Sequence, residues 1–140
     1  MTDPKAAPQD SPKRAVPRSI KVAVGILAVE ALAPGFLAAW DLIDILSGKA
    51  IMLSALLAQL ALWLGAALWV AFTAKRLYDG RAWARSAAVF WQLVQLSVAW
   101  GSFTGQFANW WIGGALILTS LAVFVFVLSR ESLAYTAREI

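Results

Sequence analysis

The chain has 140 residues, of which 61% are hydrophobic and 14% are charged, and its net charge is +4. Soluble domains are about 45–50% apolar and roughly 25% charged, and a domain of this length cannot bury so large an apolar excess, which argues against both a water-soluble globule and a disordered chain. The chain has neither cysteine nor histidine, which excludes disulfides, thiolate chemistry and the usual zinc or haem ligands, so we expect no metal and no cofactor.

The first 19 residues differ from the rest of the chain because they are rich in proline and in basic residues. They hold four of the five prolines, and their cations are Lys5, Lys13, Arg14 and Arg18. Proline fixes its own φ and has no backbone N–H to donate, so its repeated occurrence prevents a helix. We therefore predict a disordered tail over residues 1–19.

Four long apolar stretches follow, at residues 20–46, 51–74, 84–104 and 110–129. A helix needs about 20 mainly apolar residues to cross a bilayer, and in lipid it must satisfy its own backbone hydrogen bonds. The run from Ser86 to Ser129 has no charged side chain and is long enough for two crossings. The sequence therefore predicts an all-α integral membrane protein, an antiparallel bundle of four transmembrane helices over residues 20–130, followed by a short cytoplasmic tail at 131–140.

Glu30 is the acid that lies deepest in the predicted spans. It follows the start of the first span by about ten residues, or roughly 15 Å at 1.5 Å per residue, which is half of a hydrocarbon core about 30 Å thick. A charge at that depth costs at least a few kcal/mol, so we expect the carboxyl to be protonated. One interpretation makes Glu30 a proton or cation site, and the other makes it a neutral group that hydrogen-bonds between helices.

Pro34 lies one turn beyond Glu30 in the same span. It has no N–H to donate to the backbone carbonyl of Glu30, so we predict a helix kink that leaves this carbonyl free beside the carboxyl. Broken helices at the membrane midplane form binding sites in many transporters, whereas proline kinks also occur in purely structural spans.

The other three spans each place polar side chains at a similar depth, roughly 9–15 Å from a membrane boundary at 1.5 Å per residue. With Glu30 they form a predicted buried polar cluster: Gln59, Gln92, Gln95, Thr119 and Ser120. Such groups hydrogen-bond across helices, each worth of order 1 kcal/mol. We expect Glu30 to face the bundle interior and to bond at least one of Gln59, Gln95, Thr119 or Ser120. A substrate site is the alternative interpretation.

Asp41 and Asp44 form an acidic pair near the predicted outer end of the first span. Eleven and fourteen residues at 100° each return to within about 20° and 40° of Glu30, so the three acids share one helix face. The helix dipole disfavours negative charge near a helix C-terminus. The pair either meets a partner or marks the point where the span ends in water.

The segment between the second and third spans combines cations with aromatic residues. Its candidate docking residues are Lys75, Arg76, Arg81, Trp83 and Arg85. Cations near a membrane surface attract anionic lipids by about 1 kcal/mol each. The segment therefore either docks anionic lipids or a protein partner, or serves only to fix the topology. We expect no nucleic-acid partner.

The orientation follows from the distribution of lysine and arginine. With four spans, eleven cations fall on the side that holds both termini and the Lys75–Arg85 segment, and Lys49 alone falls on the other side. Cytoplasmic flanks are enriched in cations. We therefore expect a multi-pass protein of the cytoplasmic (plasma) membrane with both termini in the cytoplasm.

Several short motifs of the chain are similar to motifs of a known group of proteins. They are the segment 80–86 (Gly-Arg-Ala-Trp-Ala-Arg-Ser), the tripeptide 91–93 (Trp-Gln-Leu), the acid in the first span and the segment 128–131 (Leu-Ser-Arg-Glu). In these motifs the chain resembles small four-span membrane proteins of actinobacteria over most of residues 20–132. The resemblance implies a membrane helix bundle and carries over neither an activity nor functional residues.

Two functions are compatible with these sequence features. The first is a non-enzymatic accessory or scaffold subunit of a larger membrane complex, which binds a membrane-protein partner or a second copy of the chain. Eight tryptophans, more than interfacial belts need, favour it. The second is a small proton-coupled transporter that uses Glu30. An enzyme is not expected, because no Ser, Thr, Lys, Asp, Glu or Tyr pattern of a nucleophile with its base is recognisable.

Overall fold

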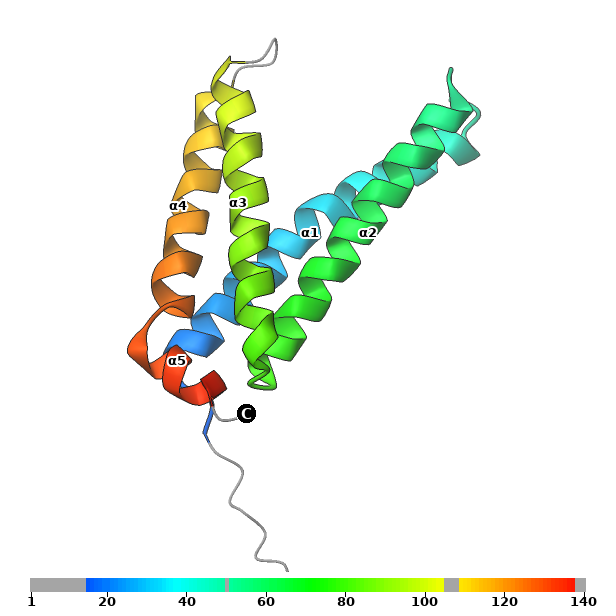
Figure 1. Cartoon of the computed structure of the whole chain (residues 1–140). Helices are drawn as coiled ribbons and strands as arrows, with labels where there is room; N and C mark the ends of the chain where they lie inside the picture. Colours follow the sequence, from blue (N-terminus) through cyan, green and yellow to red (C-terminus); the bar gives the residue numbers. More distant parts are fainter. Residues whose placement is uncertain (1–14, 50, 105–108, 138–140) are drawn as a thin grey trace, which may run out of the picture.

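A computed structural model describes residues 15–49, 51–104 and 109–137. These residues form five helices and no strand (Figure 1). The helices are α1 (Arg18–Leu46), α2 (Leu53–Tyr78), α3 (Ala82–Thr104), α4 (Trp110–Val127) and α5 (Arg130–Thr136). The all-α class is thus confirmed. Most of the predicted disordered tail lies outside the described residues, and its last two residues already belong to α1.

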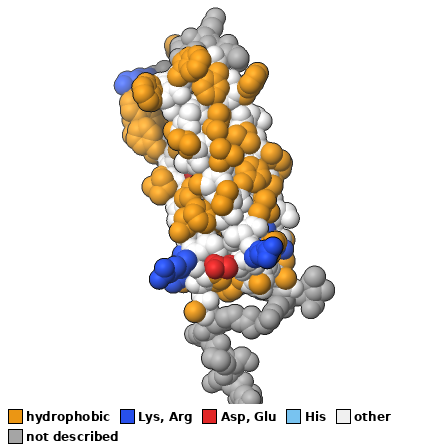
Figure 2. All heavy atoms as spheres, turned by 90° about the vertical axis from the view of Figure 1, so that its left-hand side faces the viewer, with side chains coloured by type: hydrophobic (Ala, Val, Ile, Leu, Met, Phe, Trp, Pro, Cys, Tyr) orange, Lys and Arg blue, Asp and Glu red, His pale blue; other side chains and the backbone are white. Residues whose placement is uncertain are grey.

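Three of these helices are long and apolar enough to cross a membrane, namely α1, α2 and α4. This finding supports a membrane protein. Helix α3 has 23 residues but does not qualify, because polar side chains such as Arg85, Gln92 and Gln95 lower its mean hydropathy. In the view of Figure 2, apolar side chains cover the middle of the molecule, whereas lysine and arginine side chains lie near its ends.

Local sequence explains where the helices begin and end. Helix α1 begins after Pro17, whose carbonyl accepts the first helical hydrogen bond from Lys21 N, and it ends at Leu46, two residues before Gly48, which has a φ of 69°. It continues through the buried Pro34 as one helix, so the expected kink does not interrupt it. Helix α4 begins at Asn109, whose side-chain oxygen accepts from Trp111 N and Ile112 N at 3.1 and 3.3 Å.

The long helices pair as two hairpins, α1 with α2 and α3 with α4, which pack less extensively on each other. Among the described residues, the two hairpins share an apolar core at one end. Its buried members are Ile20, Ala23, Leu27, Val70, Ala74, Leu77, Ala84, Ala88, Val123 and Val127. All of these come from the start of α1 and α3 and the end of α2 and α4. Away from that end the hairpins diverge (Figure 1).

Helix α5 occupies most of the segment for which the sequence predicts a short tail, residues 131–140. It begins at Ser129, whose side chain accepts from Ser132 N at 3.3 Å, and it lies across the end of the bundle where the core is. Ser132 and Thr136 are buried there. This helix has only seven residues, too few for a recognisable periodic pattern, and tertiary contacts rather than length stabilise so short a helix.

Candidate functional site

Glu30 and Gln92 form the centre of a buried polar cluster between α1, α3 and α4. The Nε2 group of Gln92 donates to Glu30 Oε2 at 3.0 Å, and both side chains are buried, Gln92 completely. Glu30 lies on the inward face of α1 together with Pro34, Ala38 and Asp41. The carboxyl therefore faces other helices rather than the surface of the molecule.

The side chain that donates to Glu30 at 3.0 Å is Gln92, one helical turn before Gln95, while Thr119 and Gln95, two of the four expected partners, lie close to the same carboxyl. The expected depths assumed four parallel helices. In the structure α1 crosses α3 obliquely (Figure 1), so each residue of α1 advances less than 1.5 Å along the axis of α3. Glu30 is therefore level with an earlier turn of α3.

A second pair extends the cluster toward α4. The hydroxyl of Ser120 donates to Gln95 Oε1 at 3.4 Å, and both residues are buried. Thr119 is half-buried and donates to the backbone carbonyl of Leu116 at 3.1 Å, within its own helix. Hydrogen-bonding side chains of Thr119, Trp91 and Gln95 also lie close to the Glu30 carboxyl. The structure thus brings together five of the six expected cluster residues.

Trp91 is a member of the cluster that the sequence did not suggest. Tryptophan counts as apolar in a helical hydropathy pattern, so only its neighbour Gln92 indicated that this turn of α3 is polar. Its indole Nε1 is buried without a hydrogen-bond partner among the described residues. The same holds for Glu30 Oε1 and Gln92 Oε1. The cluster therefore contains one unpaired donor and two unpaired acceptors, and a proton on Glu30 would add a second donor.

Gln59, the sixth expected member, lies outside the cluster. It is exposed on α2 and donates to Asp41 Oδ1 at 3.2 Å. Helix α2 begins at Leu53, two residues later than expected, and it diverges from α3, so Gln59 reaches the end of α1 rather than the centre of the bundle. Asp41 is buried, and Asp44, one turn later, is half-buried. A groove beside them is lined by Asp44, Lys49 and Gln59, among others.

The basic segment between α2 and α3 is ordered by aromatic contacts. The Arg76 guanidinium lies 4.9 Å from the centroid of the Phe72 ring, and this ring lies 5.8 Å from that of Trp83. Tyr135 of α5 donates to the backbone carbonyl of Tyr78 at 3.0 Å. Lys75 and Arg81 are exposed, whereas Arg85 is half-buried. The five expected docking residues therefore lie at one end of the bundle but on different faces.

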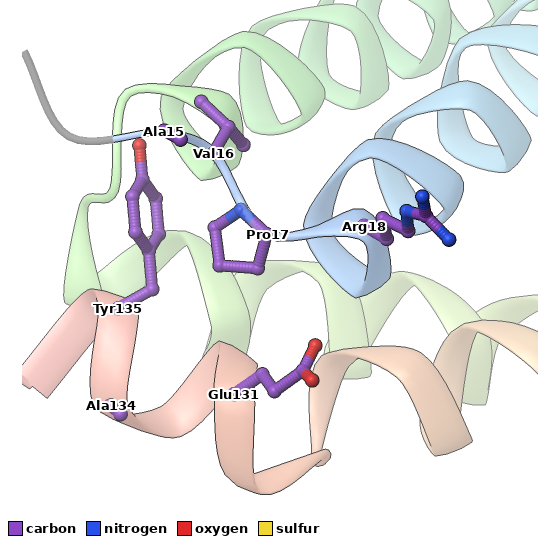
Figure 3. A pocket seen from close by; sticks show the side chains of 7 residues that line it. All are labelled: Ala15, Val16, Pro17, Arg18, Glu131, Ala134 and Tyr135. Carbon is purple, nitrogen blue, oxygen red and sulfur yellow. The ribbon is translucent and has the colours of Figure 1, made fainter.

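Helix α5 is fastened by a chain of hydroxyl groups that sequence reasoning missed. Ser129 donates to Ser132 at 3.0 Å, Ser132 to Ser19 at 3.1 Å, and Ser19 to the carboxylate of Glu131 at 3.3 Å. Figure 3 shows Glu131 and Tyr135 reaching from α5 toward the segment that precedes α1. Serines at the two ends of a chain give no periodic signal, and only the fold brings them together.

Among the described residues, no group of three or more Asp, Glu, His or Cys side chains is arranged to hold a metal ion. What the polar cluster can do chemically is to hold a proton or to bond between helices. Comparison of the chain with protein-family models, with curated protein sequences and with solved structures finds no match.

Proposed function

We propose that the chain is a four-span protein of the cytoplasmic membrane with both termini in the cytoplasm, and that it acts as a non-enzymatic accessory or scaffold subunit. The burial of the polar residues of α3 supports its inclusion as the fourth span. Gln92 and Gln95 are turned toward α1 and α4, so neither amide would face lipid. The uneven distribution of cations supports the orientation.

The observation that carries the accessory role is the one-sided core of the bundle. Among the described residues, the hairpins share buried apolar residues at one end, whereas at the diverging end no shared apolar core covers the exposed Phe36 and Trp40. Trp40 is 57% exposed on α1 and packs against Phe36 with 6.2 Å between ring centroids. Close by, the exposed Gln59 amide pairs with Asp41. Aromatic anchors beside a polar pair fit a surface that packs against the transmembrane helix of another subunit.

The test of this role compares variants of the diverging end with a matched control. The tagged full chain is purified from its own membrane in mild detergent, and proteins in fixed stoichiometry with it are quantified. We expect a stoichiometric membrane-protein partner that is lost when Phe36 and Trp40 are both changed to Ala. It should remain when Leu64 and Leu68, exposed on α2, are both changed to Ala. Absence of any stoichiometric partner, or equal loss in both variants, would contradict the accessory role.

The unpaired oxygens of Glu30 and Gln92 favour a second candidate function, a small proton-coupled transporter. The Glu30 carboxyl is the group that can bind and release a proton, and once protonated it can donate to an acceptor such as the unpaired Gln92 oxygen. The substitution Glu30→Gln separates the two functions, because the amide keeps the shape and the hydrogen bonding but exchanges no proton. We expect this variant to assemble in normal amount. Loss of a proton-dependent flux into reconstituted vesicles, with folding unchanged, would favour the transporter instead.

A further inference from the structure

A groove between α3 and the end of α4 combines a cation with an apolar wall. Its lining residues are Arg85, Ser86, Val89, Phe90, Leu93 and Leu128, and its volume is about 340 Å³. Positions 86, 89, 90 and 93 follow the i, i+3, i+4, i+7 pattern, so they lie along one face of α3. The polar residues stand at the end of the groove near the basic segment, and the apolar ones extend toward the middle of the helix.

Arg85 stands at that end without a partner. Its Nε is buried and has no hydrogen-bond partner among the described residues, and the structure records no ion pair for this side chain there. The neighbouring Arg76 differs, since its guanidinium lies over the Phe72 ring. A buried, unpaired guanidinium N–H is costly, and an anionic group that accepts from it would remove this cost. The Ser86 hydroxyl, one residue on, supplies a second donor to the same region.

We propose that this groove is a binding site for one anionic phospholipid. The phosphate accepts hydrogen bonds from Arg85 and Ser86, and an acyl chain lies along Val89, Phe90 and Leu93 against Leu128. Lipid is the fitting source of the phosphate, because the wall beyond the two polar residues is apolar and each buried CH₂ adds to the affinity. The inference rests on the proposed membrane placement of α3 and goes beyond the general attraction of the basic segment for lipid.

The experiment measures lipid binding to the full chain in detergent by native mass spectrometry. Dioleoyl phosphatidylglycerol and dioleoyl phosphatidylcholine, which share their acyl chains, are titrated separately. We expect Arg85→Gln to weaken binding of the anionic lipid at least about fivefold, which corresponds to about 1 kcal/mol for one cation. Binding of phosphatidylcholine should fall less, because its choline cation offsets the charge of the phosphate. The control is Lys21→Gln, which removes an exposed cation from the same end of the molecule but not from the groove.

A second variant and a competition measurement test whether the guanidinium and the whole lipid are recognised. Arg85→Lys keeps the charge but loses the planar fork of donors, so its affinity should fall between those of the wild type and Arg85→Gln. Inorganic phosphate, added at the same concentration as the lipid, should not displace the bound phosphatidylglycerol. Equal losses in Arg85→Gln and Lys21→Gln would overturn the site, because they would indicate attraction by net charge alone. Displacement by inorganic phosphate would overturn the lipid as its ligand.

Membrane insertion is assessed separately by flotation of the chain with vesicles. A chain that fails to float contradicts the proposed membrane placement. A chain that floats, folds and yet shows no preference for the anionic lipid contradicts only the groove. If Arg85→Gln fails to fold, Leu93→Ala, which shortens the apolar wall at an exposed position, replaces it. Leu93→Ala should lower the affinity for both lipids by a similar factor. Unchanged affinity would contradict an acyl chain in the groove.

Discussion

At the scale of single residues, the fold depends most on how buried polar atoms are paired. Glu30 and Gln92 are buried in helices that are otherwise apolar at this level, and one hydrogen bond of 3.0 Å joins them. Removing one partner of a buried hydrogen bond leaves the other unsatisfied, at a cost of about 1–3 kcal/mol, whereas replacing both by apolar groups is close to neutral. This asymmetry yields a direct test.

We expect Gln92→Leu to lower the free energy of unfolding by about 1–3 kcal/mol, because it leaves the Glu30 carboxyl without its donor. The double variant Glu30→Leu with Gln92→Leu should regain most of this loss. Unfolding in mixed micelles measures both. Ser97→Ala is the control, since Ser97 is exposed and bonds only to a carbonyl of its own helix. If the double variant loses the sum of the two single losses, the two side chains are not coupled.

Gly80 illustrates how one residue connects a turn to a distant helix. Its φ is 83°, in the left-handed region, and a Cβ there would lie 3.1 Å from Cε1 of Tyr135. Gly48 has a similar φ of 69° but open space around it. Alanine at either position pays for the left-handed backbone, about 1–2 kcal/mol. Only at position 80 must it also displace the ring of Tyr135.

We therefore expect Gly80→Ala to lower the midpoint of thermal unfolding further than Gly48→Ala does. Gly80→Ala should also raise hydrogen exchange in α5, because Tyr135 holds α5 to the turn through its bond to the Tyr78 carbonyl. Both quantities are measured on the full chain in detergent. Equal losses of stability in the two variants would show that the contact with Tyr135 contributes nothing.

At the scale of elements, α5 is the part of the fold that depends most on tertiary contacts. It has seven residues and so cannot be stable on its own. The hydroxyl of Ser132 is completely buried, 3.1 Å from Ser19 Oγ of α1 and 2.6 Å from the Phe126 carbonyl oxygen of α4. One side chain thus holds α5 to two other helices.

We expect Ser132→Ala to release α5 while leaving the four long helices intact. The change removes the hydroxyl that joins three elements and leaves Ser19 with one partner fewer. Backbone amides of residues 133–136 should exchange at least tenfold faster, which corresponds to a loss of about 1.4 kcal/mol in local stability. Helicity by circular dichroism should hardly change. Unchanged exchange in α5 would mean that the remaining bonds, from Tyr135 to the Tyr78 carbonyl and from Ser19 to Glu131, are enough to hold it.

At the scale of the whole molecule, the number of helices that cross the membrane decides on which side each loop lies. Helices α1, α2 and α4 have sufficient length and apolar character, and α3 is the proposed fourth span. Because the chain has no cysteine, single cysteines can be placed at will. With four spans, positions 47 and 108 lie on the outer side and position 11 on the cytoplasmic side.

We expect an impermeant thiol reagent to label Ser47→Cys and Ala108→Cys on intact cells and to spare Ser11→Cys. Positions 11 and 108 lie outside the described residues, so this expectation rests on the distribution of charge and on the number of spans. Labelling after lysis verifies that position 11 is reactive. Labelling of position 11 on intact cells would reverse the orientation, and protection of position 108 would exclude α3 as a span.

The sequence by itself determined the helical class, the positions of the four long helices to within about four residues and the membrane character of three of them. These features depend on local composition, because a long apolar segment in lipid has no alternative to a helix. The same reasoning identified Glu30, Gln92, Gln95 and Ser120 as buried polar residues, since amides and acids stand out against an apolar background.

Only the tertiary structure decided which of these residues meet. The oblique crossing of α1 and α3 pairs Glu30 with Gln92, and the divergence of the hairpins leaves Gln59 with Asp41. The angle between α1 and α3 and the angle between the two hairpins cannot be obtained from the depth of a residue along its own helix. Crossing angles follow from how the side chains of two helices interlock. Helix α5 was missed for the same reason, since Ser19 and Ser132 acquire their roles from a contact between the two ends of the chain.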